Sequence, residues 1–390
     1  MNGPLSAHKA LCRLLAAAWE PQGLPSPESI PWPGVWRLVE SGNLSPSLYA
    51  ATREMRGAIP PDIGQALKNA YYQSVADNAR CLHQLVQVRE ALSSTGAPVL
   101  LLKGAALVET LYGDSSLRRI GDIDLAVPLP YVPACRQALL ELGYVSDQIE
   151  HRPGFNLAYR NEVSFWPPSP FQAQVELHWH ILNVPYYLLK APIDWFWENT
   201  ELRSVAGQPF HLLSPEANLI YLPAHLALHH RFQAFHSFVD LALLIAHHRE
   251  SLDWDRIIAT ARSFDLLAAL RETLERMAQC WPSLPIDGPR RQLALIEPSR
   301  TDERLFRLLT TDSLSAGLRF YATLASLPDL AAQARFIWVH LFPQPGYMMP
   351  RYDIQARWQL PYWYLYRLAE GLTRFARALP GARRLGRDRR

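Results

Sequence analysis

The chain has 390 residues, and this length predicts two or three structural units around at least one sizeable hydrophobic core. Hydrophobic residues make up 49% of it and charged residues only 19%, which excludes disorder as its main state. The formal net charge of +3 is too small to indicate a nucleic-acid partner, and no apolar run is long enough to span a membrane.

The amino-terminal segment and the cysteines indicate a cytoplasmic protein with free thiols. Arg13 interrupts the apolar patch of this segment, which is atypical of a signal peptide. The four cysteines, Cys12, Cys81, Cys135 and Cys280, are widely spaced and form no CxxC pair. We therefore expect ordinary thiols, with neither a disulfide framework nor a zinc ribbon.

The residues before Pro98 are expected to be helical. Residues 61–95 form one long predicted helix, because Leu85, Val88 and Leu92 recur at helical spacing. The Gly-Ala-Pro sequence that follows would end this helix. The sequence thus predicts a helical amino-terminal region over residues 1–97.

From residue 98 to residue 212, short apolar runs alternate with helical stretches, which predicts an α/β unit. The expected strands are 99–102, 123–128, 163–166 and 174–180, and the expected helices are 105–112 and 132–142. Residues 213–390 are expected to be helical, with a kink at Pro223. The last 24 residues contain eight arginines, and this basic end favours a solvated terminus over a phosphate-binding tail.

Two aspartates head the second predicted strand. Asp122 and Asp124 are two residues apart, so their side chains would point to the same face. Carboxylates this close repel each other unless a cation or a proton lies between them. Mg²⁺ prefers such hard oxygen ligands, so the pair is a candidate magnesium site.

The turn before the first predicted helix of the α/β unit could hold phosphates. Lys103 and Gly104 separate the strand 99–102 from the helix 105–112, whose free amide groups would face the same edge. Lys103 could add a positive charge there, although it could also be an exposed residue at a strand end. Arg118 could contact phosphate or form a structural ion pair with Asp114 or Asp122, and the residues alone leave both open.

A third carboxylate is expected on the last predicted strand of the unit. Along residues 174–180, Glu176, His178 and His180 alternate with apolar residues and would share one face. We expect Glu176 to join the two aspartates and His178 to lie beside the nucleotide. The alternative is a half-exposed strand with its polar face in solvent.

A histidine-rich stretch follows in the carboxy-terminal region. His225 and His229 lie one helical turn apart and are expected to line the nucleotide or acceptor cleft, or to be packed as polar core residues. A zinc site is the weakest alternative, because no glutamate lies between them as it does in a metalloprotease helix. Asp240 lies in an apolar helix, so we expect a histidine or an arginine as its partner. We expect Asp240 to belong to the nucleotide site, and the alternative is a structural ion pair.

These motifs together resemble the DNA-polymerase-β-like nucleotidyltransferase superfamily. Along the chain, the motifs that carry the resemblance follow one another in this order: a strand, the Lys103-Gly104 turn, a helix, an arginine, the Gly-Asp-Ile-Asp-Leu sequence around Asp122 and an acidic residue on a later strand. Within the superfamily, the chain is most similar to the bacterial uncharacterised nucleotidyltransferase family. The resemblance covers most of the chain from about Arg53 onward.

The resemblance implies a mixed-sheet nucleotidyltransferase core flanked by amino-terminal and carboxy-terminal helical regions. It also implies Mg²⁺-dependent transfer of a nucleoside monophosphate from a nucleoside triphosphate (NTP) to a hydroxyl or similar acceptor on a small molecule, peptide or protein. Two Mg²⁺ ions would be held by Asp122, Asp124 and Glu176, and Gly104 would let backbone amides approach the phosphates. Two alternatives stay open, namely a non-catalytic nucleotide-binding protein, because Lys103 replaces the usual turn residue, and a transferase that uses a sugar nucleotide.

Overall fold

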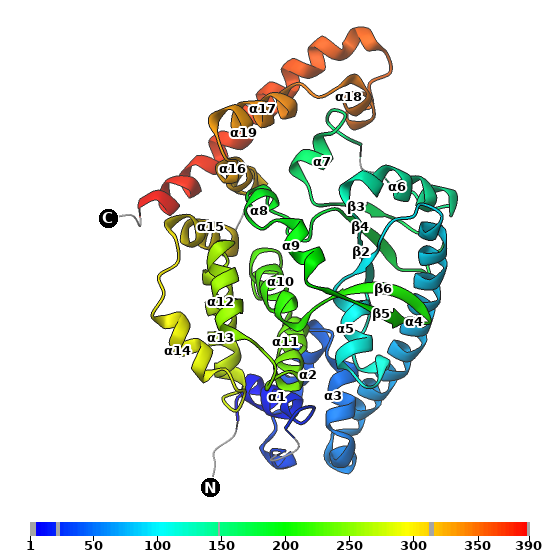
Figure 1. Cartoon of the computed structure of the whole chain (residues 1–390), viewed down its shortest axis with the longest axis vertical. Coiled ribbons are helices and arrows are strands. Elements are labelled where there is room, and N and C mark those ends of the chain that lie inside the picture. Colours follow the sequence, from blue (N-terminus) through cyan, green and yellow to red (C-terminus); the bar gives the residue numbers. More distant parts are fainter. Residues whose placement is uncertain (1–4, 21–23, 147–148, 312–315, 388–390) are drawn as a thin grey trace.

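The computed structural model describes residues 5–20, 24–146, 149–311 and 316–387, and shows a six-stranded sheet surrounded by helices (Figure 1). The expected α+β fold is confirmed. Among the described residues, no helix is both long enough and apolar enough to cross a bilayer. Residues 388–390, the last part of the arginine-rich end, lie outside the described residues.

The amino-terminal region is helical, as predicted. Its longest element, α4, begins at Pro61, where a proline is compatible with the first helical turn, and ends at Ser93. Gly96 follows with a φ of +69°, a left-handed conformation that favours glycine and turns the chain into the sheet. The shorter helices are α1 (Ala7–Ala16), η1 (Pro27–Ser29), α2 (Trp32–Ser41), α3 (Ser45–Ala51) and η2 (Arg53–Ala58).

The sheet is mixed, with the strand order β3-β4-β2-β1-β6-β5. The central strand β2 runs parallel to β4 and antiparallel to β1, and its register places Asp124 directly opposite Glu176. The edge strands are β3, antiparallel to β4, and β5, antiparallel to β6, which in turn runs parallel to β1. The bounds are β1 (Leu100–Leu101), β2 (Asp122–Ala126), β3 (Glu162–Phe165), β4 (Gln174–His178), β5 (Thr200–Val205) and β6 (Gln208–Leu213).

The hairpin of β5 and β6 was not predicted. Strand β5 is mostly exposed, so its sequence carries no alternation of apolar and polar residues. Ala206 and Gly207 both have positive φ, as a tight two-residue hairpin turn requires. The hairpin extends the sheet through the pairing of β6 with β1.

Both faces of the sheet are buried. Alternate residues of the strands, such as Leu101, Ile123 and Leu125, pack against α4 and α6 (Val132–Glu141). On the other face, Leu100 and Ala126 join a larger core formed with α5 (Lys103–Leu111) and with helices from both ends of the chain. Figure 1 shows α4 running along the outside of the sheet.

The carboxy-terminal region is helical, and Pro223 lies inside α10 (Pro215–Leu228), whose first turn is capped by Ser214. The helices of the larger core include α1 and α13, so the regions before and after the sheet share one core. The remaining elements are η3 (Ser115–Leu117), η4 (Leu129–Tyr131), α7 (Phe155–Tyr159), α8 (Pro185–Lys190), α9 (Ile193–Glu198), α11 (Phe235–His247), α12 (Trp254–Ser263), α13 (Leu267–Cys280), α14 (Asp287–Ala294), α15 (Arg300–Thr310), α16 (Ala316–Ser326), α17 (Leu330–Leu341), α18 (Pro345–Arg351), η5 (Arg357–Gln359) and α19 (Leu360–Arg387).

Two of the four cysteines form a disulfide, so the expectation of four ordinary thiols was wrong. Cys12 of α1 is bonded to Cys280 of α13, with their Cα atoms 5.4 Å apart, whereas Cys81 and Cys135 are free and buried. The two bonded residues are separated by 268 positions in the chain. They meet because α1 packs against α13, a tertiary contact that cysteine spacing cannot reveal.

Reduction of this disulfide should lower the melting temperature. The bond closes a very long loop, and such a bond stabilises the fold by about 2–4 kcal/mol through its constraint on the unfolded chain. Thermal unfolding with and without a phosphine reductant measures the effect. The Cys12→Ser/Cys280→Ser variant is the control and should melt at the same temperature in both buffers. Equal melting of the wild-type protein with and without reductant would show that the bond adds no stability.

Acid should loosen the packing around His151. Its ring stacks on Tyr347 at 4.2 Å between centroids and contacts His340 at 4.7 Å and Phe155 at 4.9 Å. Burial, and then the nearby His340, lower the pKa of His151 from 6.5 to about 3. The neutral ring therefore stabilises the fold fully above pH 6.5, and this contribution is lost as the pH falls toward 3.

The expected loss is at most about 1.4 kcal/mol for each pH unit below 6.5. Urea unfolding at a series of pH values, followed by tryptophan fluorescence, measures it. His151→Phe keeps an aromatic ring but cannot be protonated, so it should show a shallower dependence over this range. Parallel curves for the two proteins would assign the acid sensitivity to other groups.

Candidate functional site

The three acidic residues predicted from the sequence lie together at one edge of the sheet. Asp122 and Asp124 belong to β2, and Glu176 lies opposite Asp124 on the parallel strand β4. Asp122 and Glu176 line a cleft of about 310 Å³, and Asp124 is buried beside it. The structure thus brings carboxylates from two adjacent strands to one cleft.

Asp124 is the centre of this cluster. Its Oδ1 atom accepts hydrogen bonds from Lys103 Nζ at 2.7 Å and His178 Nε2 at 3.0 Å. Burial alone would raise the pKa of Asp124, but the positive Lys103 and His178 hold it well below its usual range. Its Oδ2 atom is buried and has no hydrogen-bond partner among the residues that the structure describes. A buried carboxylate oxygen without a partner is costly unless a ligand completes it.

Asp122 has the opposite environment. Burial, and then the neighbouring Asp124, raise its pKa from 3.8 to about 6. No cationic side chain lies within ion-pair distance of its carboxylate among the described residues. A cation bound in the cleft would relieve this repulsion, as expected for carboxylates that share a site.

His178 links the cluster to a fourth carboxylate. Its Nδ1 atom lies 3.1 Å from Glu162 Oε2, and its Nε2 atom also lies 3.6 Å from Glu176 Oε2. Burial lowers the pKa of His178, but Glu162 and Asp124 outweigh this and raise it to about 9. His178 therefore acts as a second buried cation whose two ring nitrogens both face carboxylates.

The donors of this site fit a divalent cation. Asp124, Glu176 and His178 each offer an atom within 4.8 Å of the others, and Asp122 lines the same cleft. Because both nitrogens of His178 already face carboxylates, the oxygens of Asp122, Asp124 and Glu176 are the better donors. Carboxylate oxygens are the ligands that Mg²⁺ prefers. The unpartnered Oδ2 of Asp124 is the atom that most needs such a ligand.

Lys103 adopts an unusual backbone conformation. Its φ is +47°, in the left-handed region, which costs a residue other than glycine roughly 1–2 kcal/mol. Its side chain is mostly buried and reaches Asp124 at 2.7 Å and Glu176 at 3.8 Å. Burial lowers the pKa of Lys103, but Asp124 raises it well above its ordinary value. The lysine predicted to bind phosphate thus contacts two of the carboxylates predicted to bind the metal.

Gly104 makes room for a buried ion pair. A Cβ atom at this position would lie 2.6 Å from Arg118 Nη1, closer than any real contact. Arg118 Nε in turn donates to Asp240 Oδ1 at 2.8 Å, and the Tyr112 hydroxyl donates to the same oxygen at 2.7 Å. The expectation that a histidine or an arginine partners Asp240 is confirmed. The partner of Arg118 is Asp240, so neither of the ion-pair partners considered from the sequence is correct.

Gly104→Ala should therefore displace Arg118 and reduce the melting temperature. The added methyl group cannot coexist with the guanidinium, so the buried pair must shift, at a cost of about 1–3 kcal/mol. Differential scanning calorimetry measures the loss. Gly113→Ala is the matched control, because nothing lies within 4 Å of a Cβ atom there. Equal stability of both variants would show that Arg118 adjusts without strain.

Histidines form another wall of the cleft. His225 and His229 stack with centroids 4.8 Å apart, and His230 contacts both rings. Burial, and then Lys103, lower the pKa of His225 and His229, so the rings are neutral at pH 7. The metal-type clusters found within the described ranges do not include these histidines, so the geometry does not favour the zinc alternative.

Sequence reasoning missed several residues of the site. His230 and His236 line the cleft beside the expected pair, and Glu162 holds His178 from β3. Tyr221 of α10 is buried, and its hydroxyl has no hydrogen-bond partner in the described part of the chain. The histidines lay in a stretch already recognised as histidine-rich, but Glu162 and Tyr221 carry no sequence signal because only the fold brings them near Lys103 and His178. His180 lies beyond the end of β4 and contacts the carbonyl of Ala191, away from the carboxylates.

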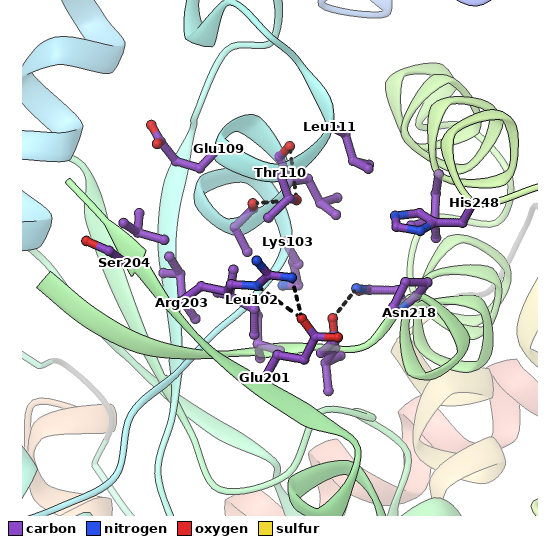
Figure 2. Close-up of a pocket in the computed structure, with 18 residues that line it drawn as sticks. Leu102, Lys103, Glu109, Thr110, Leu111, Glu201, Arg203, Ser204, Asn218 and His248 are labelled. Atoms are coloured by element: carbon purple, nitrogen blue, oxygen red, sulfur yellow. Dashed lines mark hydrogen bonds and ion pairs between the residues drawn. The ribbon is translucent and has the colours of Figure 1, made fainter. Parts of the chain in front are cut away.

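A second cavity of about 480 Å³ adjoins the acidic cleft (Figure 2). The two share Lys103 and Leu107 among their lining residues. Figure 2 shows the ion pair of Arg203 and Glu201 on the hairpin side, facing α5 and the helices that carry Asn218 and His248. These residues are scattered from α5 to the end of α11, and no sequence motif joins them.

Comparison with known proteins identifies the family. The family model described as "Uncharacterised nucleotidyltransferase" matches residues 28–282, more than half of the chain. No curated protein matches the chain significantly. A similar solved structure is the "antigenic nucleotidyltransferase-like protein from Paracoccidioides brasiliensis", with 16% identity, a TM-score of 0.34 and coverage of 54% of this chain and 92% of that one. The match of the family model over this span, which contains both β2 and β4, shows that the chain belongs to the uncharacterised nucleotidyltransferase family.

Proposed function

We propose that this protein transfers a nucleoside monophosphate from an NTP to a hydroxyl or similar acceptor, with Mg²⁺ as cofactor. The observation that carries the proposal is the buried, unpartnered Oδ2 atom of Asp124, placed among the carboxylates of Asp122 and Glu176. Such an arrangement is unstable without a bound cation and suits one that also holds phosphates. Family membership supports nucleotidyl transfer as the reaction class.

The chemistry requires placement and charge neutralisation. In the transfer, the acceptor oxygen forms a bond to the α-phosphorus, the bond from that phosphorus to the β-phosphate oxygen breaks, and pyrophosphate leaves. When bound, Mg²⁺ would polarise the phosphate oxygens and stabilise the leaving pyrophosphate. Asp122 and Asp124 would hold the cation, and Glu176, which is partly exposed in the cleft, would take the proton of the acceptor hydroxyl.

The remaining residues of the cleft would position the nucleotide. Arg119 is exposed in the cleft and pairs only loosely with Asp77, at 3.5 Å, so it can reach a phosphate. Arg118 and Asp240 would keep the Gly104 turn in place, and the amides of this turn would face the phosphates. The neutral rings of His225 and His229 would offer a flat surface for a base or for the acceptor.

The test is metal-dependent release of pyrophosphate. The purified protein is incubated with each α-labelled NTP and Mg²⁺, with and without EDTA, and with pools of hydroxylated metabolites, peptides or proteins as acceptors. We expect pyrophosphate and a labelled acceptor with at least one NTP, and neither product in EDTA. Metal-independent product, or equal product from an Asp124→Asn variant, would contradict the proposal.

A second candidate function is nucleotide binding without turnover. The observation that favours it is the Lys103 ammonium, which already neutralises Asp124 at 2.7 Å. In that case Mg²⁺ and an NTP would raise the melting temperature, since ligand binding stabilises the folded state, but no acceptor would yield pyrophosphate. The same incubation therefore separates the two functions.

A further inference from the structure

We infer that the ammonium of Lys103 replaces one of the two metal ions, so that the site binds a single divalent cation with its nucleotide. The inference rests on the proposed function and departs from the two ions that the resemblance implies. Lys103 would then be a positioning residue that sets how many cations the carboxylates accept.

The Lys103 ammonium lies between two carboxylates of the site. Lys103 Nζ lies 2.7 Å from Asp124 Oδ1 and 3.8 Å from Glu176 Oε2, so it bridges the carboxylates of two adjacent strands. A metal ion shared by these two residues would need the same place. The ammonium is held there by a side chain that is only 16% exposed, so it is not a passing surface contact.

The backbone of Lys103 has a positive φ. A turn that needs a φ of +47° is usually filled by glycine, which adopts this conformation freely. A lysine occupies this position, and its side chain runs from the turn to Asp124. The strain is consistent with a function for the ammonium at the far end of that side chain.

The charges of the three carboxylates and the Lys103 ammonium match those of a single divalent cation. Asp122, Asp124 and Glu176 carry three negative charges, and the Lys103 ammonium cancels one. The two that remain match one divalent cation. A second ion would leave a net positive site. His178 contacts Asp124 as well as Glu162, and the negative charge of Glu162 offsets the positive charge of His178, so the two together do not alter the balance.

Lys103 leaves some carboxylate oxygens of the site free to bind a cation. The ammonium and His178 both contact Asp124 Oδ1, so Oδ2 is the open donor of that residue. Asp122 makes no ion pair within the described part of the chain and lines the cleft nearby. One cation on Asp124 Oδ2 and Asp122 would use the free oxygens without displacing Lys103.

Counting bound Mn²⁺ tests the inference without any turnover. The wild-type protein is titrated with Mn²⁺ in the presence of α,β-methylene-ATP, and free Mn²⁺ is followed by electron paramagnetic resonance. We expect one Mn²⁺ for each wild-type chain and two for Lys103→Gly, in which glycine suits the positive φ and the ammonium is lost. The two ions of the variant should show spin coupling, because paired metal sites hold ions about 4 Å apart.

Two further variants control the experiment. Ala206→Gly also replaces a positive-φ residue, in the hairpin turn of β5 and β6, and should bind one ion as the wild type does. Lys103→Met keeps the length of the side chain without its charge. It replaces Lys103→Gly in the titration if circular dichroism shows that Lys103→Gly does not fold. It is also expected to bind two ions.

The outcomes separate the inference from the proposed function. Two coupled ions in the wild type, or one ion in both the wild type and the folded Lys103 variants, would overturn the role of Lys103 and leave the proposed function standing. No Mn²⁺ bound to the wild type with the α,β-methylene analogues of ATP, GTP, CTP and UTP, each tested in turn, would overturn the proposed function itself, and the inference with it.

Discussion

Asp124→Asn is expected to reduce metal-dependent pyrophosphate release by roughly 1,000-fold, the scale seen when a preorganised charge is removed from a catalytic site. The carboxylate of Asp124 lies between Lys103 and His178, and its buried Oδ2 atom has no partner among the described residues. An amide keeps the shape of the side chain but loses its negative charge. The bound cation would then lose its central ligand.

The same variant is also expected to be less stable. Lys103 and His178 would face a neutral group, and breaking a buried ion pair from one side costs about 3–5 kcal/mol. Activity is therefore measured below the melting temperature of the variant, with folding checked by circular dichroism. Asp287→Asn, which removes an exposed carboxylate far from the cleft, should change neither property. A folded Asp124→Asn protein with the wild-type rate would refute the catalytic role.

Asp240→Ala is expected to destabilise the fold by about 3–5 kcal/mol. Asp240 is buried and accepts hydrogen bonds from Arg118 and Tyr112, so its loss leaves the Arg118 guanidinium charged and unpaired inside the protein. The urea midpoint should fall while the slope of the transition stays constant, as expected for a change in stability alone. Because Arg118 packs against Gly104, the turn beside the carboxylates would lose its support as well.

Two controls define the origin of this loss. Glu201→Ala breaks an ion pair with Arg203 in which both side chains are at least half exposed, and such a pair contributes about 0–1 kcal/mol. Arg118→Met/Asp240→Leu removes both buried charges and should recover much of the stability lost in Asp240→Ala. A loss below about 1 kcal/mol for Asp240→Ala would show that water or another side chain compensates Arg118.

The periodic parts of the fold could be predicted from the sequence. In the long helix α4 apolar residues recur at helical spacing, and in β2 and β4 apolar residues alternate with polar ones, so each element shows its own period in the sequence. The hairpin of β5 and β6 could not be predicted, because β5 is largely solvent-exposed and because the position of the hairpin depends on the pairing of β6 with β1. The division of the chain at residues 98 and 213 stays a prediction.

The acidic residues of the site were also visible in the sequence. The spacing of Asp122 and Asp124 on a strand, and the position of Glu176 on a later strand, place carboxylates on the faces that β2 and β4 turn toward the cleft. This works because strand geometry fixes the direction of every second side chain. The sequence alone therefore determined which side chains the sheet edge presents.

The tertiary structure decided the partners of those side chains. Pairing of β2 with β4 set Asp124 opposite Glu176, α5 carried Lys103 into the cluster, and α11 brought Asp240 to Arg118 across 122 positions of the chain. The packing of α1 on α13 likewise joined Cys12 to Cys280. Strand and helix periods are local properties of the backbone, so sequence encodes them directly. Contacts between distant elements arise from the packing of whole faces in one shared core, and no local pattern specifies which atoms meet there.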